Sequence, residues 1–458
     1  MRNRILEKIG KFNNIAIVGF GKEGKSTYNF IRSKYKDLKL TLIDKINPKE
    51  IIPELENDKY IDTCYGDNYL DNLDRFDLIF KSPGVSFKDL DRDGLSKKIT
   101  SQIEMVLEEI RDRVVAVTGS KGKSTTASLI YHLLKEQGVK ACLVGNIGVP
   151  VFDEVDSYSE DTIVVMETSC NQLEFVDVSP HIGVIVNIFQ DHLDTIGTLD
   201  RYEKAKMNMF RFQKDGDYGV YDLDNETINR CLKDMNILSK LYSVSLSDKA
   251  DCYLEDGKIY LDNNYLIDSL DIKRNILGEH NLKNIMISLK VIALLGYDVS
   301  KAIYDISTFK GLEHRMEFVG VFKDIKFYND TIATIPEATI NACNTIDSLD
   351  TLIFGGQDRG IDYSEMIDYL NKSSISNFIC MPTTGFKLAE LLDDTKHNVY
   401  KIESLEDAVK VAYQVTEKGK SCLLSPAAAS YESFKNFEEK GKKYKEYIEF
   451  YKEKEVLY

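Results

Sequence analysis

Short apolar runs alternate with amphipathic stretches along most of the chain. The runs IAIV at 15–18, VVAV at 114–117 and TLIF at 351–354 have the length and composition of buried strands. The segment KSTTASLIYHLLKEQG at 123–138 places its apolar residues on one face of a helix. Strands that alternate with helices favour parallel sheets, whose ligand sites lie at the carboxyl ends of the strands. The sequence therefore predicts an α/β fold.

This alternation divides into three blocks. The first begins with the strand at 15–18, the second begins near Arg111, and the third begins near Gly311. Late in the second block, residues 217–275 contain short alternating segments such as CYLEDGKIYLDNNYLI. Such segments are typical of antiparallel hairpins, so we expect the second block to contain both parallel and antiparallel strands.

Composition and charge narrow the class of protein. The 458 residues are enough for two or three domains, and 43% hydrophobic with 29% charged residues is ordinary for a soluble globular protein. A net charge of −15 argues against a general nucleic-acid or membrane-surface role. No apolar run approaches membrane-spanning length, and the charged amino terminus does not resemble a secretion signal. Eight cysteines without a C-x-x-C pair indicate a reducing cytoplasm.

The VVAV strand runs directly into the sequence TGSKGKSTT. Gly119 and Gly122 allow a sharp turn in which backbone N–H groups point at one place. Lys123 adds a cation there, and Ser124 or Thr125 can hold Mg²⁺ against the phosphates of a nucleotide. The spacing G-x-x-G-K-S is two residues shorter than that of the common phosphate loop. A glycine-capped helix is the alternative, but strand, turn and amphipathic helix occur in the right order, so we predict that the chain binds a nucleoside triphosphate.

Further candidates lie near the ends of the following strands. Glu167 closes the strand TIVVME, where a carboxylate can ligate the Mg²⁺ of a nucleotide, although a solvated glutamate is the alternative. Asp191 and His192 close the next strand, and their pairing favours a metal or phosphate contact over a structural histidine. Lys206 lies in a helical stretch, and its local sequence alone indicates a solvated surface lysine.

Other motifs leave two interpretations open. The pattern Gly19-x-Gly21-x-x-Gly24 fits a dinucleotide-binding turn or a similar turn without a dinucleotide, and the second nucleotide site makes a redox role less favoured. Asn281, near the start of an apolar helix, can cap that helix or contact a purine or ribose. Arg315 in GLEHRME can reach a triphosphate or lie on the surface.

Taken together and in order, these motifs resemble the Mur ligases, ATP-dependent enzymes that form amide bonds in peptidoglycan synthesis. The resemblance spans nearly the whole chain through GSKGKSTT, GNIG, ETSCNQLE, DHLD, AKMN, GEHNLKN, GLEHRME, YNDTIAT, FGGQDRG and LLSPAAASYESFKNFEEKG. Within the family, the chain is most similar to the ligase that adds D-glutamate to UDP-N-acetylmuramoyl-L-alanine. Any one motif is modest evidence, but ten in sequence order are strong.

The resemblance implies three domains and a set of ligands. We expect a Rossmann-like, UDP-substrate-binding domain at 1–108, a central ATP-binding P-loop domain at 109–310, with a parallel sheet plus a small antiparallel sheet, and a Rossmann-like, amino-acid-binding domain at 311–458. The implied ligands are ATP, UDP-N-acetylmuramoyl-L-alanine, D-glutamate or L-glutamate, two Mg²⁺ ions, and CO₂ held as a carbamate on Lys206. We expect a cytoplasmic monomer without a nucleic-acid partner or a membrane span.

The resemblance also assigns residues to each ligand. ATP is expected at Gly119, Ser120, Lys121, Gly122, Lys123, Ser124, Thr125, Asn281, Arg315 and Asp330, and the UDP-substrate at Gly21, Asp44, Ser82, Gly84, Asn146, Ser169 and Gln172. The amino acid is expected at Thr334, Arg359, Ser430 and Phe437, and the metal ions at Ser124, Glu167, His192 and carbamylated Lys206. The implied catalytic residues are Lys123, Glu167, His192 and Lys206.

The acceptor pocket departs from the family pattern, which leaves alternatives open. The residues TIAT at 331–334 replace the common Ser-Lys-Ala-Thr, so a lysine that contacts the amino acid in the family is absent. A ligase of the same superfamily that adds L-glutamate or another amino acid is therefore the first alternative. A non-catalytic protein that uses ATP to switch domain angles is the second, and the set Glu167, His192 and Lys206 disfavours it. An oxidoreductase is the least favoured.

Overall fold

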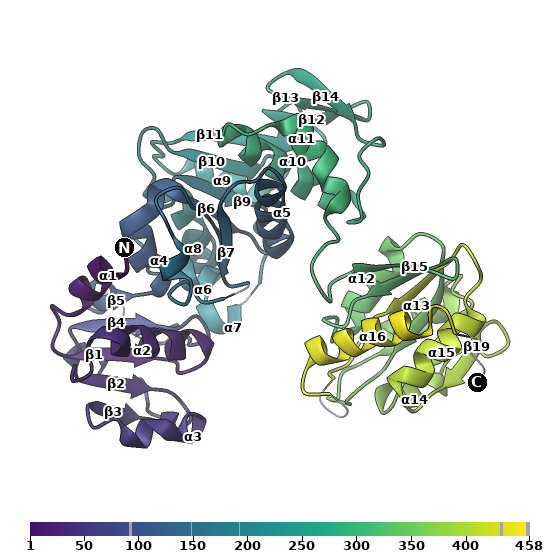
Figure 1. Cartoon of the computed structure of the whole chain (residues 1–458), viewed down its shortest axis with the longest axis horizontal. Helices are drawn as coiled ribbons and strands as arrows, with labels where there is room; N and C mark the ends of the chain where they lie inside the picture. Colours follow the sequence, from purple (N-terminus) through teal and green to yellow (C-terminus); the bar gives the residue numbers. More distant parts are fainter. Residues whose placement is uncertain (91–93, 148, 192, 431–433, 455–458) are drawn as a thin grey trace. The chain divides into compact units, whose positions relative to one another are not determined.

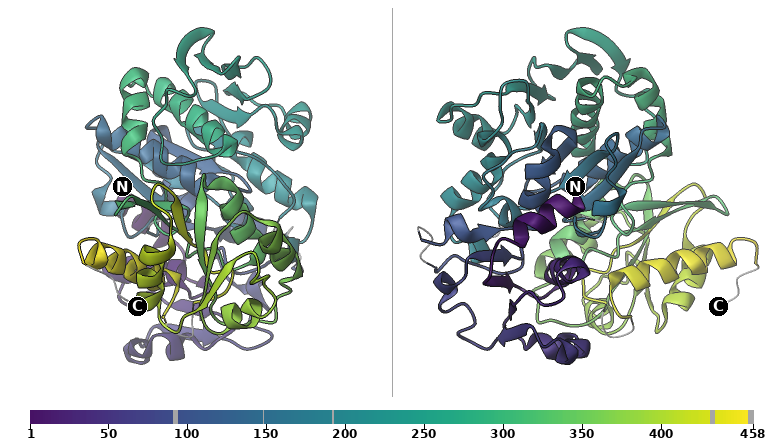
Figure 2. Two further views of the ribbon diagram at one scale, coloured as in Figure 1. Left: turned by 90° about the vertical axis from the view of Figure 1, so that its right-hand side faces the viewer. Right: turned by 60° about the vertical axis from the view of Figure 1, so that its left-hand side comes forward.

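The computed structural model describes residues 1–90, 94–147, 149–191, 193–430 and 434–454, which form three sheets in two compact units (Figures 1 and 2). Met1–Lys273 and His280–Ile306 form the first unit, which contains two of the sheets. Arg274–Glu279 and the chain from Ser307 onward form the second unit, which contains the third. The expected α/β class is confirmed. Short 3₁₀ helices lie at Pro53–Asn57, Leu73–Arg75, Ser96–Lys98, Arg111–Arg113, Val155–Ser157 and Ile306–Thr308.

The first sheet has five parallel strands in the order β3-β2-β1-β4-β5. They are β1 (Ile15–Val18), β2 (Leu40–Ile43), β3 (Ile61–Cys64), β4 (Leu78–Lys81) and β5 (Ile99–Thr100), with helices α1 (Arg2–Ile9), α2 (Lys22–Lys34), α3 (Pro48–Ile51) and α4 (Gln102–Ile110). All four residues of β1 are buried, since its neighbours pair along both edges and α2 packs on it. The edge strands β3 and β5 carry no clear apolar signal, which is why the sequence did not indicate them.

The second sheet has nine strands in the order β14-β13-β12-β11-β10-β9-β6-β8-β7. They are β6 (Val114–Thr118), β7 (Ala141–Gly145), β8 (Ile163–Glu167), β9 (Ile182–Ile185), β10 (Tyr218–Asp222), β11 (Lys240–Ser245), β12 (Cys252–Glu255), β13 (Lys258–Leu261) and β14 (Asn264–Asp268). The helices are α5 (Lys123–Glu136), α6 (Cys170–Leu173), α7 (Leu193–Ile196), α8 (Leu199–Arg211), α9 (Glu226–Lys233), α10 (Glu279–Leu294) and α11 (Val299–Asp305).

The hairpin prediction for residues 217–275 is correct for only part of that segment. The strands β12, β13 and β14 are antiparallel to one another, as expected. However, β10 and β11 pair in parallel with β9 and with each other, because α9 provides a crossover connection between them. The antiparallel strands do not form a small separate sheet. They continue the parallel sheet through the pairing of β11 with β12.

The two sheets of the first unit share one hydrophobic core. The Phe152 ring stacks on Phe30 at 4.1 Å between centroids and meets Phe80 edge-on at 6.3 Å. The backbone N–H of Phe152 donates to Oε1 of Gln102 at 3.1 Å. Phe152 comes from the central part of the chain, whereas Phe30 lies in α2 and Phe80 in β4, so the two parts of the first unit pack as one body. The domain boundary at residue 108 stays a prediction.

The third sheet is covered by helices on both faces. Its strands are β15 (Glu317–Phe322), β16 (Ile325–Asn329), β17 (Leu349–Phe354), β18 (Asn377–Cys380), β19 (Asn398–Lys401) and β20 (Ser421–Leu424), in the order β15-β16-β20-β17-β18-β19. The edge strand β15 is antiparallel to β16, and the other neighbouring strands pair in parallel. Leu352 and Phe354 of β17 pack in one core, which is lined by α12 (Pro336–Thr345), α13 (Ser364–Lys372) and α14 (Thr384–Ala389). Ile353 packs in a second core, which is lined by α15 (Leu405–Val415) and α16 (Phe437–Tyr451). Burial on both faces explains why the second half of β17, Leu352, Ile353 and Phe354, is a continuous apolar run.

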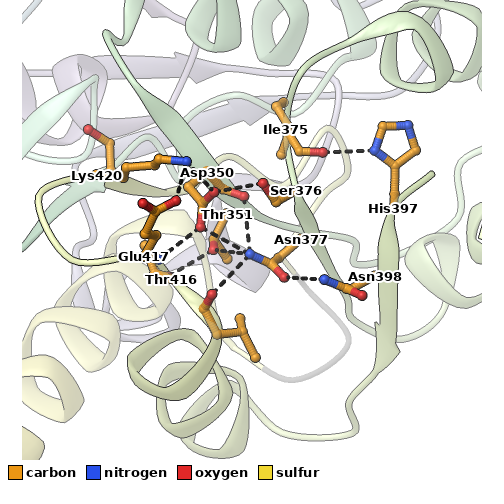
Figure 3. A network of polar contacts seen from close by, with 12 residues as sticks. Asp350, Thr351, Ile375, Ser376, Asn377, His397, Asn398, Thr416, Glu417 and Lys420 are labelled. Carbon is orange, nitrogen blue, oxygen red and sulfur yellow. Dashed lines mark hydrogen bonds and ion pairs between the residues drawn. The ribbon is translucent and has the colours of Figure 1, made fainter.

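A buried polar network joins the amino-terminal ends of β17 and β18 (Figure 3). The Asp350 carboxylate accepts hydrogen bonds from Asn377 Nδ2 at 3.1 Å, Ser376 Oγ at 2.7 Å and the Glu417 N–H at 2.9 Å. Asn377 Nδ2 also donates to the Val415 carbonyl at 3.1 Å. Asp350 is 2% exposed and Asn377 3% exposed. The network therefore satisfies a carboxylate that water cannot reach.

We expect Asn377→Ala to lower the free energy of unfolding of the second unit by about 2–3 kcal/mol, because it leaves buried acceptors without a donor. Hydrogen exchange of the amides in β17, β18 and β20 measures the opening of this unit separately from the first. Asn344→Ala is the matched control, since the Asn344 side chain accepts one exposed hydrogen bond from Tyr369. It should change the opening free energy by less than about 0.5 kcal/mol. Equal effects of both substitutions would contradict the prediction.

Candidate active site

The loop predicted to bind phosphate joins β6 to α5. Gly122, the residue before α5, has φ +80°, which favours glycine. A Cβ at Gly122 would lie 2.9 Å from Oδ1 of Asn284 and 3.1 Å from Cγ1 of Val186. A Cβ at Gly119 would lie 3.1 Å from Cβ of Val186. The backbone therefore turns where neighbouring side chains leave little room, and at Gly122 the dihedral angle also calls for glycine.

Asn187, just after β9, holds this loop in place. Its Oδ1 accepts from the N–H groups of Ser120 at 3.1 Å and Lys121 at 2.8 Å. Its Nδ2 donates to the Lys121 carbonyl at 3.0 Å. One amide side chain thus binds three backbone groups of a loop that makes few regular hydrogen bonds of its own. Sequence reasoning missed Asn187, although an amide after an apolar strand that neighbours the loop strand was a usable signal.

The first turn of α5 carries the predicted cation and hydroxyls. Lys123 Nζ donates to the Ser120 carbonyl at 3.0 Å, which folds the amine back over the loop. Ser124 and Thr125 follow it and are half-buried. The amino-terminal end of this 14-residue helix adds its partial positive charge to that of the lysine. The arrangement suits an anion with several oxygen atoms.

Lys206 lies against the same loop. Its Nζ donates to the Gly119 carbonyl at 2.6 Å, and the side chain is 1% exposed. The surface position indicated by its local sequence is therefore wrong, because the helix α8 packs on β6 and β9 and turns this residue inward. Burial lowers the pKa of the Lys206 amine to about 7, and the nearby Lys123 cation lowers it further, while Asp191 and Glu167 oppose the shift.

Glu167 closes β8 and is 1% exposed, so it is not a solvated strand-end glutamate. Its Oε1 accepts from Asn146 Nδ2 at 2.7 Å. Its Oε2 is buried and has no hydrogen-bond partner among the residues that the structure describes. The β6–β8 register places Glu167 opposite Val117, two positions before the loop. An unpartnered carboxylate oxygen beside a phosphate loop fits a Mg²⁺ ligand.

His192, which the resemblance assigns to a metal ion, lies outside the described residues. Within the described ranges, no three or more His, Cys, Asp and Glu side chains form a group that could hold a metal ion. Mg²⁺ in nucleotide sites usually takes one or two protein ligands and completes its shell with phosphate and water, so a site at Glu167 and Ser124 needs no such group and stays a prediction.

Residues expected to bind the UDP-substrate fall into two groups. In the first sheet, a Cβ at Gly21 or Gly84 would meet no described atom within 4 Å, whereas one at Gly24 would lie 2.0 Å from the Gly19 carbonyl oxygen. Gly21 and Gly84 therefore border open space, while Gly24 is needed for packing. Ser82 Oγ donates to the Gly19 carbonyl at 2.7 Å, and Asp44 Oδ2 accepts from the Phe20 N–H at 2.5 Å.

The second group lies near α6. Ser169 caps this helix in a capping box with Gln172, whose Oε1 accepts from the Ser169 N–H at 3.0 Å. Gln172 Nε2 in turn donates to Glu23 Oε2 at 3.2 Å. Burial raises the pKa of the Glu23 carboxyl to about 7, although the Gln172 hydrogen bond and Lys81 oppose this. Both expected substrate residues are thus held in fixed positions by local contacts.

Asn281 is one helical turn from Asn284 on α10, and Nδ2 of Asn284 donates to its Oδ1 at 3.0 Å. Because Asn284 packs against Gly122, the pair lies beside the phosphate loop. This position favours a nucleotide contact over simple capping.

The second unit brings several predicted residues to the carboxyl ends of its strands. Asp330 is 4% exposed and accepts from Ser425 Oγ at 2.9 Å and the Met316 N–H at 3.1 Å. Burial raises its pKa to about 6, against these two hydrogen bonds and the charge of Arg315. Arg315 itself is exposed and follows His314, which packs against α16 at Gly441.

The four residues expected to bind the amino acid occupy different environments. Ser430 is 5% exposed, and its Oγ has no partner among the described residues. Phe437, at the start of α16, meets the His314 ring edge-on at 6.1 Å. Thr334 is half-buried and Arg359 is exposed. A buried hydroxyl, an exposed guanidinium and an aromatic ring suit a small polar ligand with a carboxylate.

The first unit thus presents a phosphate loop with two lysines and a buried carboxylate at the carboxyl edge of a largely parallel sheet, which defines a nucleotide-binding protein of the P-loop class. Three family models match the chain: the MurD-like N-terminal domain of Mur ligases at 13–107, the Mur ligase middle domain at 117–292, and the glutamate ligase domain of Mur ligases at 314–428. The chain belongs to the Mur ligase family, whose members are ATP-dependent amide-bond-forming ligases.

Curated relatives match over nearly the whole chain. The UDP-N-acetylmuramoylalanine–D-glutamate ligase of Acetivibrio thermocellus is 33% identical over 461 residues, which are 96% of each chain. That of Clostridium acetobutylicum is 34% identical and covers 96% of this chain and 97% of its own. The resemblance inferred from the motifs is confirmed.

Solved structures support the fold. The ligase MurC of Thermotoga maritima has a TM-score of 0.57 at 18% identity, with 95% of this chain and 99% of that chain covered. MurF of the same organism, in complex with ADP, has a TM-score of 0.55 at 18% identity, with 95% of each chain covered. No helix in the described part of the chain is long and apolar enough to cross a membrane.

We expect Gly122→Ala to weaken ATP binding about tenfold or more, because a left-handed φ costs about 1–2 kcal/mol for alanine and the new methyl group would meet Asn284. Titration with a fluorescent ATP analogue measures this. Gly138→Ala is the matched control, since Gly138 has φ +76° but a Cβ there would meet no described atom within 4 Å. The control should lose thermal stability and keep its ATP affinity. Unchanged affinity in Gly122→Ala would be evidence against this site.

Proposed function

We propose that the chain joins D-glutamate to UDP-N-acetylmuramoyl-L-alanine with the consumption of ATP and the release of ADP and phosphate. The main support is the near-full-length match to relatives named UDP-N-acetylmuramoylalanine–D-glutamate ligase. The phosphate loop and its buried lysine and glutamate agree with this chemistry. The three domains proposed from the sequence, at 1–108, 109–310 and 311–458, would bind the UDP-substrate, ATP and the amino acid in that order.

The reaction requires a carboxylate to become an electrophile. In the proposed scheme, the alanyl carboxylate attacks the γ-phosphate of ATP and forms an acyl phosphate. The amine of glutamate then attacks the acyl carbon, and phosphate leaves from the tetrahedral intermediate. The first step brings two anions together. Lys123, the loop N–H groups and the helix terminus would offset that repulsion.

The residues of the first unit can accommodate metal ions. When bound, Mg²⁺ neutralises phosphate charge and aligns the transferred group. Glu167 and Ser124 would hold one ion, a role that fits the unpartnered Oε2 of Glu167. His192 and Lys206, the latter as a carbamate, would hold a second.

A buried amine that is partly neutral at physiological pH can take up CO₂. The nitrogen attacks the carbon of CO₂ and loses a proton, so that a cation becomes a carboxylate-like oxygen ligand. With a pKa of about 7, the Lys206 amine is neutral often enough for this reaction, whereas an exposed lysine is almost fully protonated.

The substrates would be held by the residues described above. Gly21, Asp44, Ser82, Gly84, Asn146, Ser169 and Gln172 would bind the UDP-substrate, and Thr334, Arg359, Ser430 and Phe437 the amino acid. Lys123, Asn281, Arg315 and Asp330 would contact ATP. Eight free cysteines fit a reducing compartment, so we place the reaction in the cytoplasm, with the chain acting as a monomer.

The identity of the acceptor is the point that an assay decides. We expect phosphate release from ATP only when UDP-N-acetylmuramoyl-L-alanine and D-glutamate are both present. L-glutamate is the second candidate, because residues 331–334 lack the usual lysine. Lys123→Ala should abolish turnover, since it removes the cation that folds over the loop. ATP consumption that is independent of both substrates, or absent with either enantiomer of glutamate, would overturn the proposal.

The pKa of Lys206 gives a pH dependence. At fixed dissolved CO₂, the carbamate signal in ¹³C NMR should rise between pH 6 and pH 8, because the neutral fraction of an amine with a pKa near 7 grows from about one tenth to nine tenths. The same lowered pKa means that the unfolded chain binds more protons between pH 7 and 10.5, so this group makes the fold more stable as pH rises.

Lys206→Ala should abolish both the carbamate signal and turnover, and short carboxylic acids should partly restore turnover by supplying the missing oxygen ligand. Lys204→Ala is the matched control, because Lys204 lies on the same helix in an exposed ion pair with Asp200. It should keep both signal and turnover. A fully active Lys206→Ala variant would remove this lysine from the mechanism.

A further inference from the structure

Tyr202 is a buried residue of α8 to which the sequence assigned no role. Its side chain is 0% exposed, and it lies four residues before Lys206, so both occupy the same face of the helix. The hydroxyl lies 2.6 Å from Ser120 Oγ, and the ring centroid lies 4.7 Å from Lys206 Nζ. A single aromatic side chain therefore touches both the phosphate loop and the buried lysine.

The direction of the hydrogen bond follows from the partners of Ser120. Its Oγ donates to the Phe189 carbonyl at 2.9 Å and accepts from the Phe189 N–H at 2.8 Å. A serine hydroxyl has one proton and two lone pairs. Since the proton is used at Phe189, Tyr202 is the donor and Ser120 the acceptor. The Ser120 hydroxyl then makes all three of its possible hydrogen bonds, and these bonds hold the Ser120 side chain in one orientation.

The contacts from α8 reach two adjacent loop residues. Lys206 donates to the Gly119 carbonyl, and Tyr202 donates to the Ser120 side chain. Asn187 holds the next backbone groups from the strand side. The loop is thus held from two sides, by α8 and by Asn187, just after β9. Its remaining N–H groups can point toward a ligand.

We propose that Tyr202 is a positioning residue for nucleotide binding, which fixes the phosphate loop through Ser120 and provides the wall against which the Lys206 side chain lies. The proposal rests on the proposed ATP-dependent function and adds to it. Tyr202 itself would not touch the nucleotide. It acts by keeping the loop in its binding conformation before ATP arrives, which reduces the ordering that binding would otherwise require.

The test uses Tyr202→Phe, which keeps the ring and removes only the hydroxyl. We expect the dissociation constant for a fluorescent ATP analogue to rise about 3- to 10-fold, the effect of one intramolecular hydrogen bond. The KM for ATP should rise with it, while the KM for the UDP-substrate stays within about twofold. Tyr158→Phe is the matched control, because the buried Tyr158 hydroxyl donates to the Val151 carbonyl at 3.0 Å. It should lower thermal stability to a similar degree and leave ATP affinity unchanged.

A double-mutant cycle separates positioning from a general loss of stability. If the hydroxyl acts through Ser120, Tyr202→Phe should add less than about twofold to the dissociation constant in a Ser120→Ala background. Wild-type affinity in Tyr202→Phe, full additivity with Ser120→Ala, or an equal loss in Tyr158→Phe would each overturn the proposal. Nucleotide binding is measured without donor or acceptor. A wild-type chain that binds ATP but releases no phosphate would therefore refute the ligase function and leave the Tyr202 result to stand.

Discussion

The first unit depends on one constraint: a short backbone turn must present its N–H groups outward while its other polar groups are satisfied from behind. The turn between β6 and α5 is too tight for ordinary side chains, as the φ of Gly122 and its distance from Asn284 show. It also makes few regular hydrogen bonds. Asn187, just after β9, and Lys206 on α8 supply the missing partners, so the loop is shaped by its surroundings as much as by its glycines.

Burial of charged groups follows from the same arrangement. The loop follows β6, which has β9 and β8 on its two sides and α8 packed against it, so the lysine and glutamate beside the loop are removed from water. Lys206 has its pKa lowered, and Glu167 keeps one oxygen without a described partner. The buried lysine and the unpartnered carboxylate oxygen both lower the stability of the chain without a ligand. Buried polar groups that lack hydrogen-bond partners are common where ligands bind. A metal ion and phosphates would supply the missing partners.

In the second unit, the two ends of the sheet have different tasks. Asp330, Ser425 and Ser430 lie at or beyond the carboxyl ends of the strands, where several buried hydroxyls, including that of Ser430, have no described partner. The network of Asp350 and Asn377 lies at the amino-terminal ends, where each side chain has several partners. A buried carboxylate and amide with several partners at one end, and buried hydroxyls without a described partner at the other, fit a parallel sheet with one functional edge.

The sequence by itself determined the phosphate loop, the family and most of the alternating strands and helices, because these depend on residues that are adjacent along the chain. It predicted β12–β14 as antiparallel strands but not the parallel pairing of β10 and β11, since pairing partners lie far apart in sequence. Only the tertiary structure decided which polar residues are buried together. Lys206 and Gly119 are 87 positions apart, and the environment that lowers the pKa of this lysine exists only once α8 has packed against the sheet. The contacts of Asn187 and Tyr202 with the phosphate loop likewise join residues that are far apart in sequence, so only the tertiary structure shows them.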